Sequence, residues 1–244
     1  MLTIVLVHGA FADASSWNQV IERLQKKGHQ VVAPPNPLRG IDADSAYLRS
    51  VVDQIDGPVL LVGHSYGGAV ISNVVGKARN VVGLVFVAAF APDDGEWLGD
   101  VTTQSRDAIL GPALLQKTYP TGKGVETAVE FMINPARLHE VFAADLTAEQ
   151  AAILAATQRP IAQAAFTDKS GPPAWKSIKS WAVVATGDKA AGTDLVRQMA
   201  QRAGAKITEI DSSHVVMISH PDAVTDVILE AARTVEPTGA GARR

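Results

Sequence analysis

The segment Gly63–Gly67, with the sequence Gly-His-Ser-Tyr-Gly, constrains the fold of this chain more than any other. The apolar run Pro58–Val62 precedes it, and the helix-compatible residues Gly68–Ile71 follow it. A strand, a Gly-x-Ser-x-Gly turn and a helix in this order place a serine on a sharp bend. Glycines flank that serine because a Cβ at either position would collide with the neighbouring strand or helix. The segment therefore predicts an α/β unit with Ser65 on the bend.

Six short apolar runs along the chain predict buried strands. Each is almost continuously apolar and rich in β-branched residues, which is typical of strands that are covered on both faces. The runs are Leu2–Val7, Gln30–Ala33, Val59–Val62, Val81–Ala89, Trp181–Thr186 and Lys206–Ile210. Helix-compatible stretches such as 16–24, 195–203 and 222–235 alternate with them. We expect an α/β fold with a doubly wound, mostly parallel sheet of about six strands.

The segment between Ala91 and Lys179 breaks this alternation. It contains helix patterns and loop breakers but no convincing buried strand. Since a structureless loop of that length is implausible in a compact domain, residues 97–177 are predicted to form an inserted helical lid. Residues 1–96 and 178–236 then form the core, and the tail 237–244 is expected to be disordered.

Composition excludes several classes of function. The 244 residues include 22 basic and 25 acidic ones without a basic stripe, so nucleic acid is not an expected partner. The absence of cysteine excludes disulfides, thiolate metal sites and a cysteine nucleophile. No apolar run approaches the ~20 residues that span a bilayer, and the run Leu2–Val7 has no basic region before it, which favours a core strand over a signal peptide. We expect a cytoplasmic protein without membrane partner, cofactor or metal, and a homodimer is compatible with the sequence.

A serine hydroxyl is a weak nucleophile near neutral pH and needs a neighbouring base that an acid orients. His214 directly follows the run Lys206–Ile210 and precedes the last helical stretch. It is therefore expected at the carboxyl edge of the sheet, where active sites of α/β proteins form. We predict Ser65 as the nucleophile and His214 as the base.

The other histidines have plainer interpretations. His220 lies beside Pro221 and suits a capping or surface position. His64 adjoins the serine, but neighbours on a sharp bend point in different directions. His29 and His139 are expected at the surface.

Asp188 is the predicted acid. It follows the run Trp181–Thr186 at the same edge of the sheet, and the chain order Ser65, Asp188, His214 is the one that this fold requires. The alternatives are Asp194, Asp93 and Asp94.

An acyl-transfer site also needs two convergent backbone donors for the oxyanion. One is predicted to be the N–H of Tyr66, directly after the serine. The other is expected at Ala10 in the loop after the first strand, with Phe11 as the alternative. Gly9 lets this backbone approach a substrate closely, and His8 fits either a brace for the loop or an ordinary tight turn.

These motifs resemble those of the α/β-hydrolase superfamily. The resemblance runs from Val7–Phe11 through Gly63–Gly68 to Ser213–Met217 and covers the core better than the insertion. It is strongest to small bacterial carboxylesterases and to the plant methyl esterase and hydroxynitrile lyase group. The resemblance implies the triad and the oxyanion donors named above, without a cofactor.

Two positions differ from the hydroxynitrile lyases. Those enzymes have a threonine after the first-strand histidine and a lysine after the catalytic histidine, where this chain has Gly9 and Val215. Without the lysine, no obvious cation holds a leaving cyanide. Ser65 also argues against epoxide hydrolases and haloalkane dehalogenases, which have an aspartate at the bend.

We therefore predict a carboxylesterase-type serine hydrolase that cleaves an ester of a small, moderately hydrophobic molecule through an acyl-enzyme intermediate. A ligand-binding or receptor-like protein on a hydrolase scaffold is one alternative. Non-hydrolytic chemistry on the same triad, as in a lyase or a perhydrolase, is the other. The apolar residues of the insertion fit both its own core and the ceiling of a substrate pocket.

Overall fold

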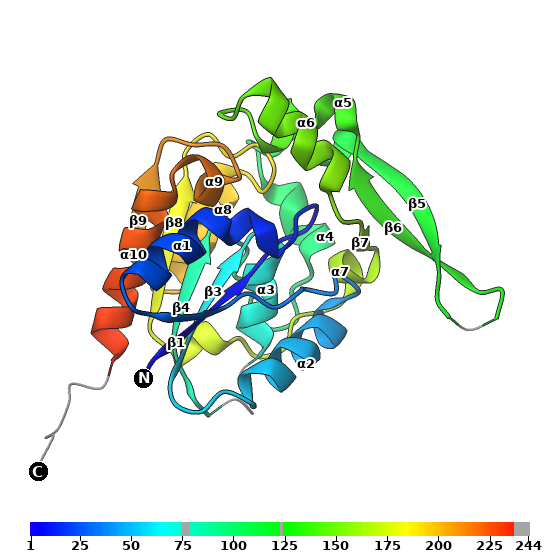
Figure 1. Cartoon of the computed structure of the whole chain (residues 1–244). Coiled ribbons are helices and arrows are strands. Elements are labelled where there is room, and N and C mark those ends of the chain that lie inside the picture. The colour runs from blue at the N-terminus through cyan, green and yellow to red at the C-terminus, as the bar shows by residue number, and fades with distance from the viewer. Residues whose placement is uncertain (75–78, 123, 237–244) are drawn as a thin grey trace, which may run out of the picture.

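The computed structural model describes residues 1–74, 79–122 and 124–236 (Figure 1). Its central sheet contains β1 (Thr3–Val7), β2 (Gln30–Val32), β3 (Val59–His64), β4 (Val81–Val87), β8 (Ser180–Ala185) and β9 (Lys206–Ile210). The strand order is β2-β1-β3-β4-β8-β9, and all neighbours pair in parallel. The six predicted runs are thus the six strands of this sheet. The predicted disordered tail, 237–244, lies outside the described residues.

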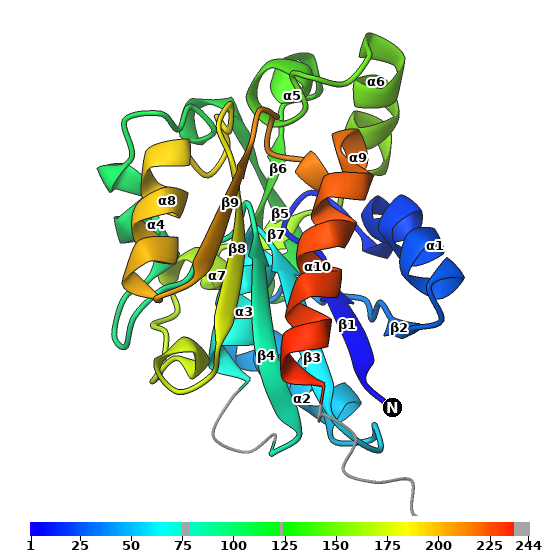
Figure 2. The ribbon, with the colours of Figure 1, turned by 90° about the vertical axis from the view of Figure 1, so that its left-hand side faces the viewer.

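Helices cover both faces of the sheet (Figure 2). One face carries α1 and α10, which pack against each other, the other carries α2 and α3, and α8 packs against β8 and β9. Because of this double cover, β1, β3 and β8 are buried at every residue, which explains their continuous apolar character. The bounds are η1 (Ala14–Trp17), α1 (Asn18–Lys26), α2 (Ile41–Val52), α3 (Tyr66–Asn73), α8 (Thr193–Arg202), α9 (Val216–Ser219) and α10 (Pro221–Val235).

The insertion between β4 and β8 contains helices and, unlike the purely helical segment expected from the sequence, a small antiparallel sheet in the order β5-β6-β7. Its helices are α4 (Leu98–Val101), η2 (Thr102–Gln104), η3 (Gly111–Ala113), α5 (Pro135–Phe142), α6 (Ala148–Thr157), α7 (Ala164–Thr167) and η4 (Ala174–Lys176). Its strands are β5 (Leu114–Pro120), β6 (Thr127–Ile133) and β7 (Ile161–Ala162). The β5–β6 hairpin projects from the body (Figure 1), and most residues of β5 are exposed. β5 therefore lacks the apolar run that marks a buried strand in a sequence.

The register of the central sheet sets the place of the site. Val7 pairs with Gly63, His64 pairs with Val87, and Ala185 pairs with Ile210. The loops after β1, β3, β8 and β9 therefore emerge at one edge, where the insertion lies (Figure 2). Within 1–74, 79–122 and 124–236, no helix combines the length and apolar character needed to cross a bilayer.

Candidate active site

The bend between β3 and α3 holds Ser65 in a strained backbone conformation, with φ 52° and ψ −122°. Such a conformation costs on the order of 1–3 kcal/mol and persists only where the surroundings enforce it. Here the N–H of Ser65 donates to Val87 O at 3.2 Å, and its carbonyl accepts from Gly68 N at 2.9 Å and from Phe90 N at 3.2 Å. These bonds hold the serine at the edge of the sheet.

The bend admits no side chain at Gly63 or Gly67. A Cβ on Gly63 would lie 2.6 Å from the carbonyl oxygen of Gly67. One on Gly67 would lie 2.5 Å from the carbonyl oxygen of Val7. Both obstacles are backbone atoms, which cannot rotate away as the end of a flexible side chain can. The backbone around Ser65 is therefore packed as closely as the two glycines in the sequence predict.

His214 and Asp188 form a buried pair at the same edge. Nδ1 of His214 lies 2.7 Å from Oδ2 of Asp188, and both side chains are 1% exposed. The other carboxylate oxygen accepts hydrogen bonds from the N–H groups of Ala190 and Ala191 at 2.9 and 3.0 Å. A carboxylate fixed in this way orients the imidazole and keeps the hydrogen on Nδ1, which leaves Nε2 as the basic nitrogen.

His214 lies against the residue that precedes Ser65. The ring centroids of His64 and His214 are 4.7 Å apart, and Nε2 of His64 lies 3.0 Å from the carbonyl oxygen of His214. Phe142, at the end of α5, also packs on His214, and the centroids of the two rings are 5.1 Å apart. No hydrogen bond joins Ser65 Oγ to His214 within the part of the chain that the structure describes. In free enzymes such a bond is often long and tightens only when substrate binds.

His64 does not take the role of the base. Burial, reinforced by His214, lowers the pKa of His64 well below its ordinary value, so the ring is neutral at pH 7. Since a carbonyl can only accept, Nε2–H of His64 donates to the backbone of His214. This contact could not be predicted from the sequence, because it spans 150 positions.

The loop after β1 lines the opposite side of the serine. A Cβ on Gly9 would lie 2.7 Å from Cβ of Ser65, so only glycine fits there. Ala10, Phe11 and Tyr66 all line the cavity beside the serine. Among the residues that the structure describes, none accepts a hydrogen bond from the backbone N–H of these three. The oxyanion site therefore stays a prediction, with Ala10 and Phe11 both open as the partner of Tyr66.

His8 braces this loop. Its Nε2 accepts the N–H of Asn36 at 2.9 Å, so the hydrogen is on Nδ1, which donates to Gly9 O at 2.9 Å. The side chain of Asn36 donates in turn to the carbonyl of His8 at 3.0 Å. Burial lowers the pKa of His8 to about 4, and the ring is neutral at pH 7. These contacts match a brace better than an ordinary turn.

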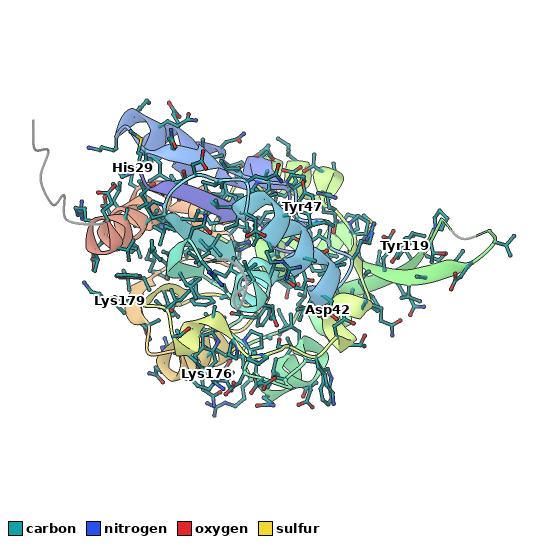
Figure 3. The ribbon with its side chains drawn as sticks, turned by 90° about the horizontal axis from the view of Figure 1, so that it is seen from below. His29, Asp42, Tyr47, Tyr119, Lys176 and Lys179 are labelled. Atoms are coloured by element: carbon teal, nitrogen blue, oxygen red, sulfur yellow. The ribbon has the colours of Figure 1, made fainter. Side chains whose placement is uncertain are left out.

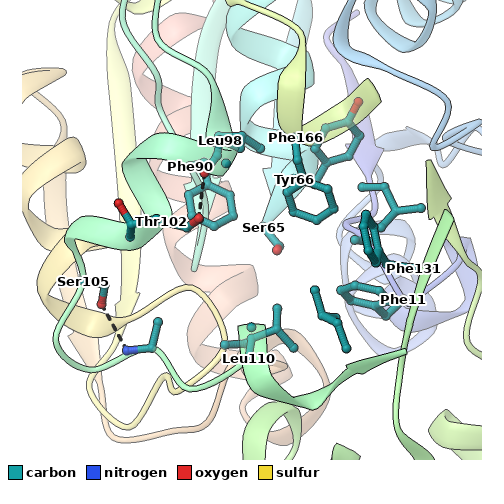
Figure 4. Close-up of a pocket in the computed structure, with 18 of the residues that line it drawn as sticks. Phe11, Ser65, Tyr66, Phe90, Leu98, Thr102, Ser105, Leu110, Phe131 and Phe166 are labelled. Carbon is teal, nitrogen blue, oxygen red and sulfur yellow. Dashed lines mark hydrogen bonds between the residues drawn. The ribbon is translucent and has the colours of Figure 1, made fainter. Parts of the chain in front are cut away.

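A cavity of about 620 Å³ opens beside Ser65 (Figure 4). Its walls are mostly aromatic and aliphatic, and the insertion contributes most of them, so some of its apolar residues do form a ceiling. Thr102, Ser105 and Gln163 add polar groups, whereas no charged side chain lines the cavity in the described structure. The buried His214–Asp188 pair also lies outside the lining. Apolar members of the wall include Phe11, Phe90, Leu110, Phe131 and Phe166.

The alternative acids make other contacts. Asp194 accepts from Ser105 Oγ at 2.5 Å and from Arg106 N at 2.8 Å. Asp93 forms an ion pair with Lys176, and Asp94 is exposed. Lys176, the partner of Asp93, has a half-exposed side chain and lies at the lower edge of the molecule in Figure 3. Of the four candidate carboxylates, Asp188 is the one that the structure brings to His214.

Comparisons with known proteins identify the family of the chain. A model of the "Alpha/beta hydrolase family" matches residues 4–227. The carbendazim hydrolyzing esterase of Nocardioides sp. (strain SG-4G) is 34% identical over 111 residues, which span 40% of this chain and 46% of that esterase. The alpha-hydroxynitrile lyase of Arabidopsis thaliana is 26% identical over 261 residues, which span 91% of this chain and 93% of the lyase. The crystal structure of polyneuridine aldehyde esterase shares the fold, with a TM-score of 0.79 at 22% identity over 94% of this chain and 98% of that one. The chain belongs to the alpha/beta hydrolase family.

Proposed function

We propose that this protein is a serine hydrolase that cleaves carboxylic esters of small, moderately hydrophobic molecules. The observation that carries the proposal is the buried hydrogen bond between His214 and Asp188 at the sheet edge where Ser65 lines an apolar cavity. Backbone donors on either side of the serine supply a place for the oxyanion. Membership of the family and an esterase among the relatives support the class of reaction.

In the proposed reaction, Nε2 of His214 takes the proton of Ser65 as Oγ attacks the ester carbonyl. Asp188 accepts from Nδ1–H and stabilises the imidazolium that forms. The N–H groups of Tyr66 and of Ala10 or Phe11 bind the tetrahedral oxyanion. His214 then protonates the leaving alcohol as its C–O bond breaks. Water, deprotonated by the same imidazole, hydrolyses the acyl-enzyme and restores the serine.

The cavity supports the substrate class. A carboxylate or ammonium group on the substrate would lose its hydration there without meeting an opposite charge, which is costly. A neutral aromatic or aliphatic ester meets only apolar and weakly polar walls. The volume of about 620 Å³ is within the range of small-molecule sites.

Turnover of p-nitrophenyl acetate by the protein and by Ser65→Ala tests the proposal. The substitution removes a single oxygen, and we expect kcat to fall by roughly four powers of ten or more, since triad members act as a unit. Near-full turnover by the variant would overturn the mechanism.

A ligand-binding function is the second candidate. Two observations favour it: His214 does not line the cavity, and it is not hydrogen bonded to Ser65 in the described structure. A binding protein would retain a hydrophobic ester in stoichiometric amount without steady-state turnover. Lyase chemistry has less support, because Val215 is uncharged and 1% exposed and Gly9 has no room for a side chain.

A further inference from the structure

The loop that carries His214 is anchored by a carboxylate from the insertion. Asp145 lies between α5 and α6. Its carboxylate accepts hydrogen bonds from Ser212 Oγ at 2.7 Å, from Ser213 N at 3.0 Å and from Ser213 Oγ. The two serines occupy the positions directly before His214. The insertion therefore holds the base loop by hydrogen bonds as well as covering it.

The serines of this anchor are buried, whereas the side chain of Asp145 is 26% exposed. Ser212 and Ser213 are 4% and 5% exposed, and Ser212 Oγ also lies 2.9 Å from Ser219 Oγ. Burial raises the pKa of Asp145, but the bonds from Ser213 and Ser212 outweigh burial, and the net pKa is below the ordinary value. The carboxylate is thus ionised at neutral pH, and its hydrogen bonds are charge-assisted, which makes them stronger than bonds between neutral groups.

A second residue of the insertion, at the end of α5, also contacts His214. Phe142, three positions earlier, packs its ring on the imidazole of His214. The insertion thus contacts both the side chain of the predicted base and the backbone that presents it. Neither residue lies in the core part of the chain that carries Ser65 and Asp188.

We propose that Asp145 is a positioning residue, which holds Ser212 and Ser213 so that His214 presents Nε2 to Ser65. This inference rests on the proposed function, in which His214 is the base. A displacement of about 1 Å in a catalytic group can cost roughly 100-fold in rate. We therefore expect loss of the anchor to lower kcat by about 10- to 100-fold. KM stays nearly unchanged, because Asp145 does not line the cavity within the described structure.

A graded set of variants separates the anchor from general stability. Asp145→Ala removes all three bonds, and Ser213→Ala removes one of them. Asp145→Asn keeps an oxygen for Ser212 and for Ser213 N–H, and its amide can donate to the Ser213 hydroxyl. The matched control is Glu140→Ala, on α5 in the same insertion, where the carboxylate pairs with Arg137 at 2.7 Å.

The readouts are kcat and KM for p-nitrophenyl acetate and the rate at which a fluorophosphonate probe labels Ser65. We expect Asp145→Ala to lower kcat and the labelling rate by about 10- to 100-fold. Ser213→Ala should give values between those of Asp145→Ala and the parent protein. Asp145→Asn is expected within about fivefold of the parent, and Glu140→Ala equal to it. Added formate should accelerate Asp145→Ala, because it can occupy the vacated carboxylate position.

Three outcomes overturn the inference: unchanged kcat and labelling in both Asp145→Ala and Ser213→Ala, a change confined to KM, or no recovery with Asp145→Asn. Should Asp145→Ala fail to fold, Ser213→Ala and Asp145→Asn decide between these outcomes. A parent protein that is neither labelled at Ser65 nor active on the ester contradicts the proposed function itself. Failure of the inference alone leaves parent labelling and turnover intact.

Discussion

His64 donates a hydrogen bond of 3.0 Å from Nε2 to the carbonyl oxygen of His214. The residue before the serine thus holds the backbone of the predicted base from the core side. Asp188 holds the ring of that base through Nδ1, and Asp145 holds its loop from the insertion. Three residues from distant parts of the chain therefore hold His214 in place.

Asp188→Asn should lower kcat by roughly 10⁴-fold, because an amide at this position favours the wrong tautomer of the histidine. Asp194→Asn is the matched control, since that carboxylate bonds Ser105 and Arg106 instead of His214. Steady-state kinetics with p-nitrophenyl acetate compares the two. Equal losses in both variants would show that the acid has been misassigned.

Gly9→Ala should impair both folding and activity. Its Cβ would lie 2.7 Å from Ser65 Cβ and 3.0 Å from the carbonyl oxygen of His64, so the loop has to move. We expect the free energy of unfolding in urea to fall by about 1–3 kcal/mol and kcat by about tenfold or more. Gly111→Ala, whose Cβ meets nothing within 4 Å, should change that free energy by less than about 0.5 kcal/mol. An unchanged unfolding midpoint for Gly9→Ala would contradict the close approach.

His8 should make the protein less stable in acid. Its pKa is 6.5 in the unfolded chain and about 4 in the fold, because burial disfavours the charged ring. Above pH 6.5 both states are neutral and the residue has no effect. As the pH falls from 6.5 towards 4, the unfolded state binds the proton first, so the free energy of unfolding declines.

For His8 the full decline is roughly 3 kcal/mol, and His64, whose pKa is lowered by burial as well, acts in the same direction. Urea unfolding of the protein and of His8→Gln between pH 7.5 and 5 measures the effect. The variant should show the shallower dependence on pH, whatever its stability at pH 7.5. Parallel curves for the two proteins would mean that His8 is not held neutral by the fold.

The uncharged cavity predicts a preference for neutral esters. Phenyl acetate and 4-acetoxybenzoate present the same acetyl group, but the second adds a carboxylate that has no cationic partner among the described lining residues. We expect kcat/KM to be about 100-fold higher for phenyl acetate, the equivalent of about 3 kcal/mol of uncompensated desolvation. Similar values for both esters would place the substrate outside this cavity.

The central sheet could be predicted from the sequence because each of its strands is marked by a short apolar run of its own. Each run, such as Val59–Val62, is apolar throughout for a strand covered on both faces, and the Gly-x-Ser-x-Gly bend marks where one of them ends. The place of Asp188 and His214 after two further strands then follows from the parallel order. The hydrogen bond between Asp188 and His214 joins the two residues that the sequence predicts as acid and base.

Other features of the fold and of the site depend on contacts between residues far apart in the chain, which leave no pattern in the nearby sequence. β5 is mostly exposed, so its residues carry no signal of a buried strand. Asp145 and Ser212 are separated by 67 positions, and nothing near either residue marks the other as a partner. The positive φ of Phe11, 59°, is likewise imposed by the loop around it and is unusual for a residue with a side chain.

In the proposed reaction Ser65 becomes acylated, with His214 as its base. Rapid acid quenching during turnover of p-nitrophenyl acetate, followed by mass spectrometry of the peptides, tests it most directly. We predict acetyl groups on the peptide that contains Ser65, none there in Ser65→Ala, and far slower acetylation in His214→Ala. Steady turnover without acetylation of Ser65, or acetylation that proceeds at the same rate without His214, would rule out this mechanism.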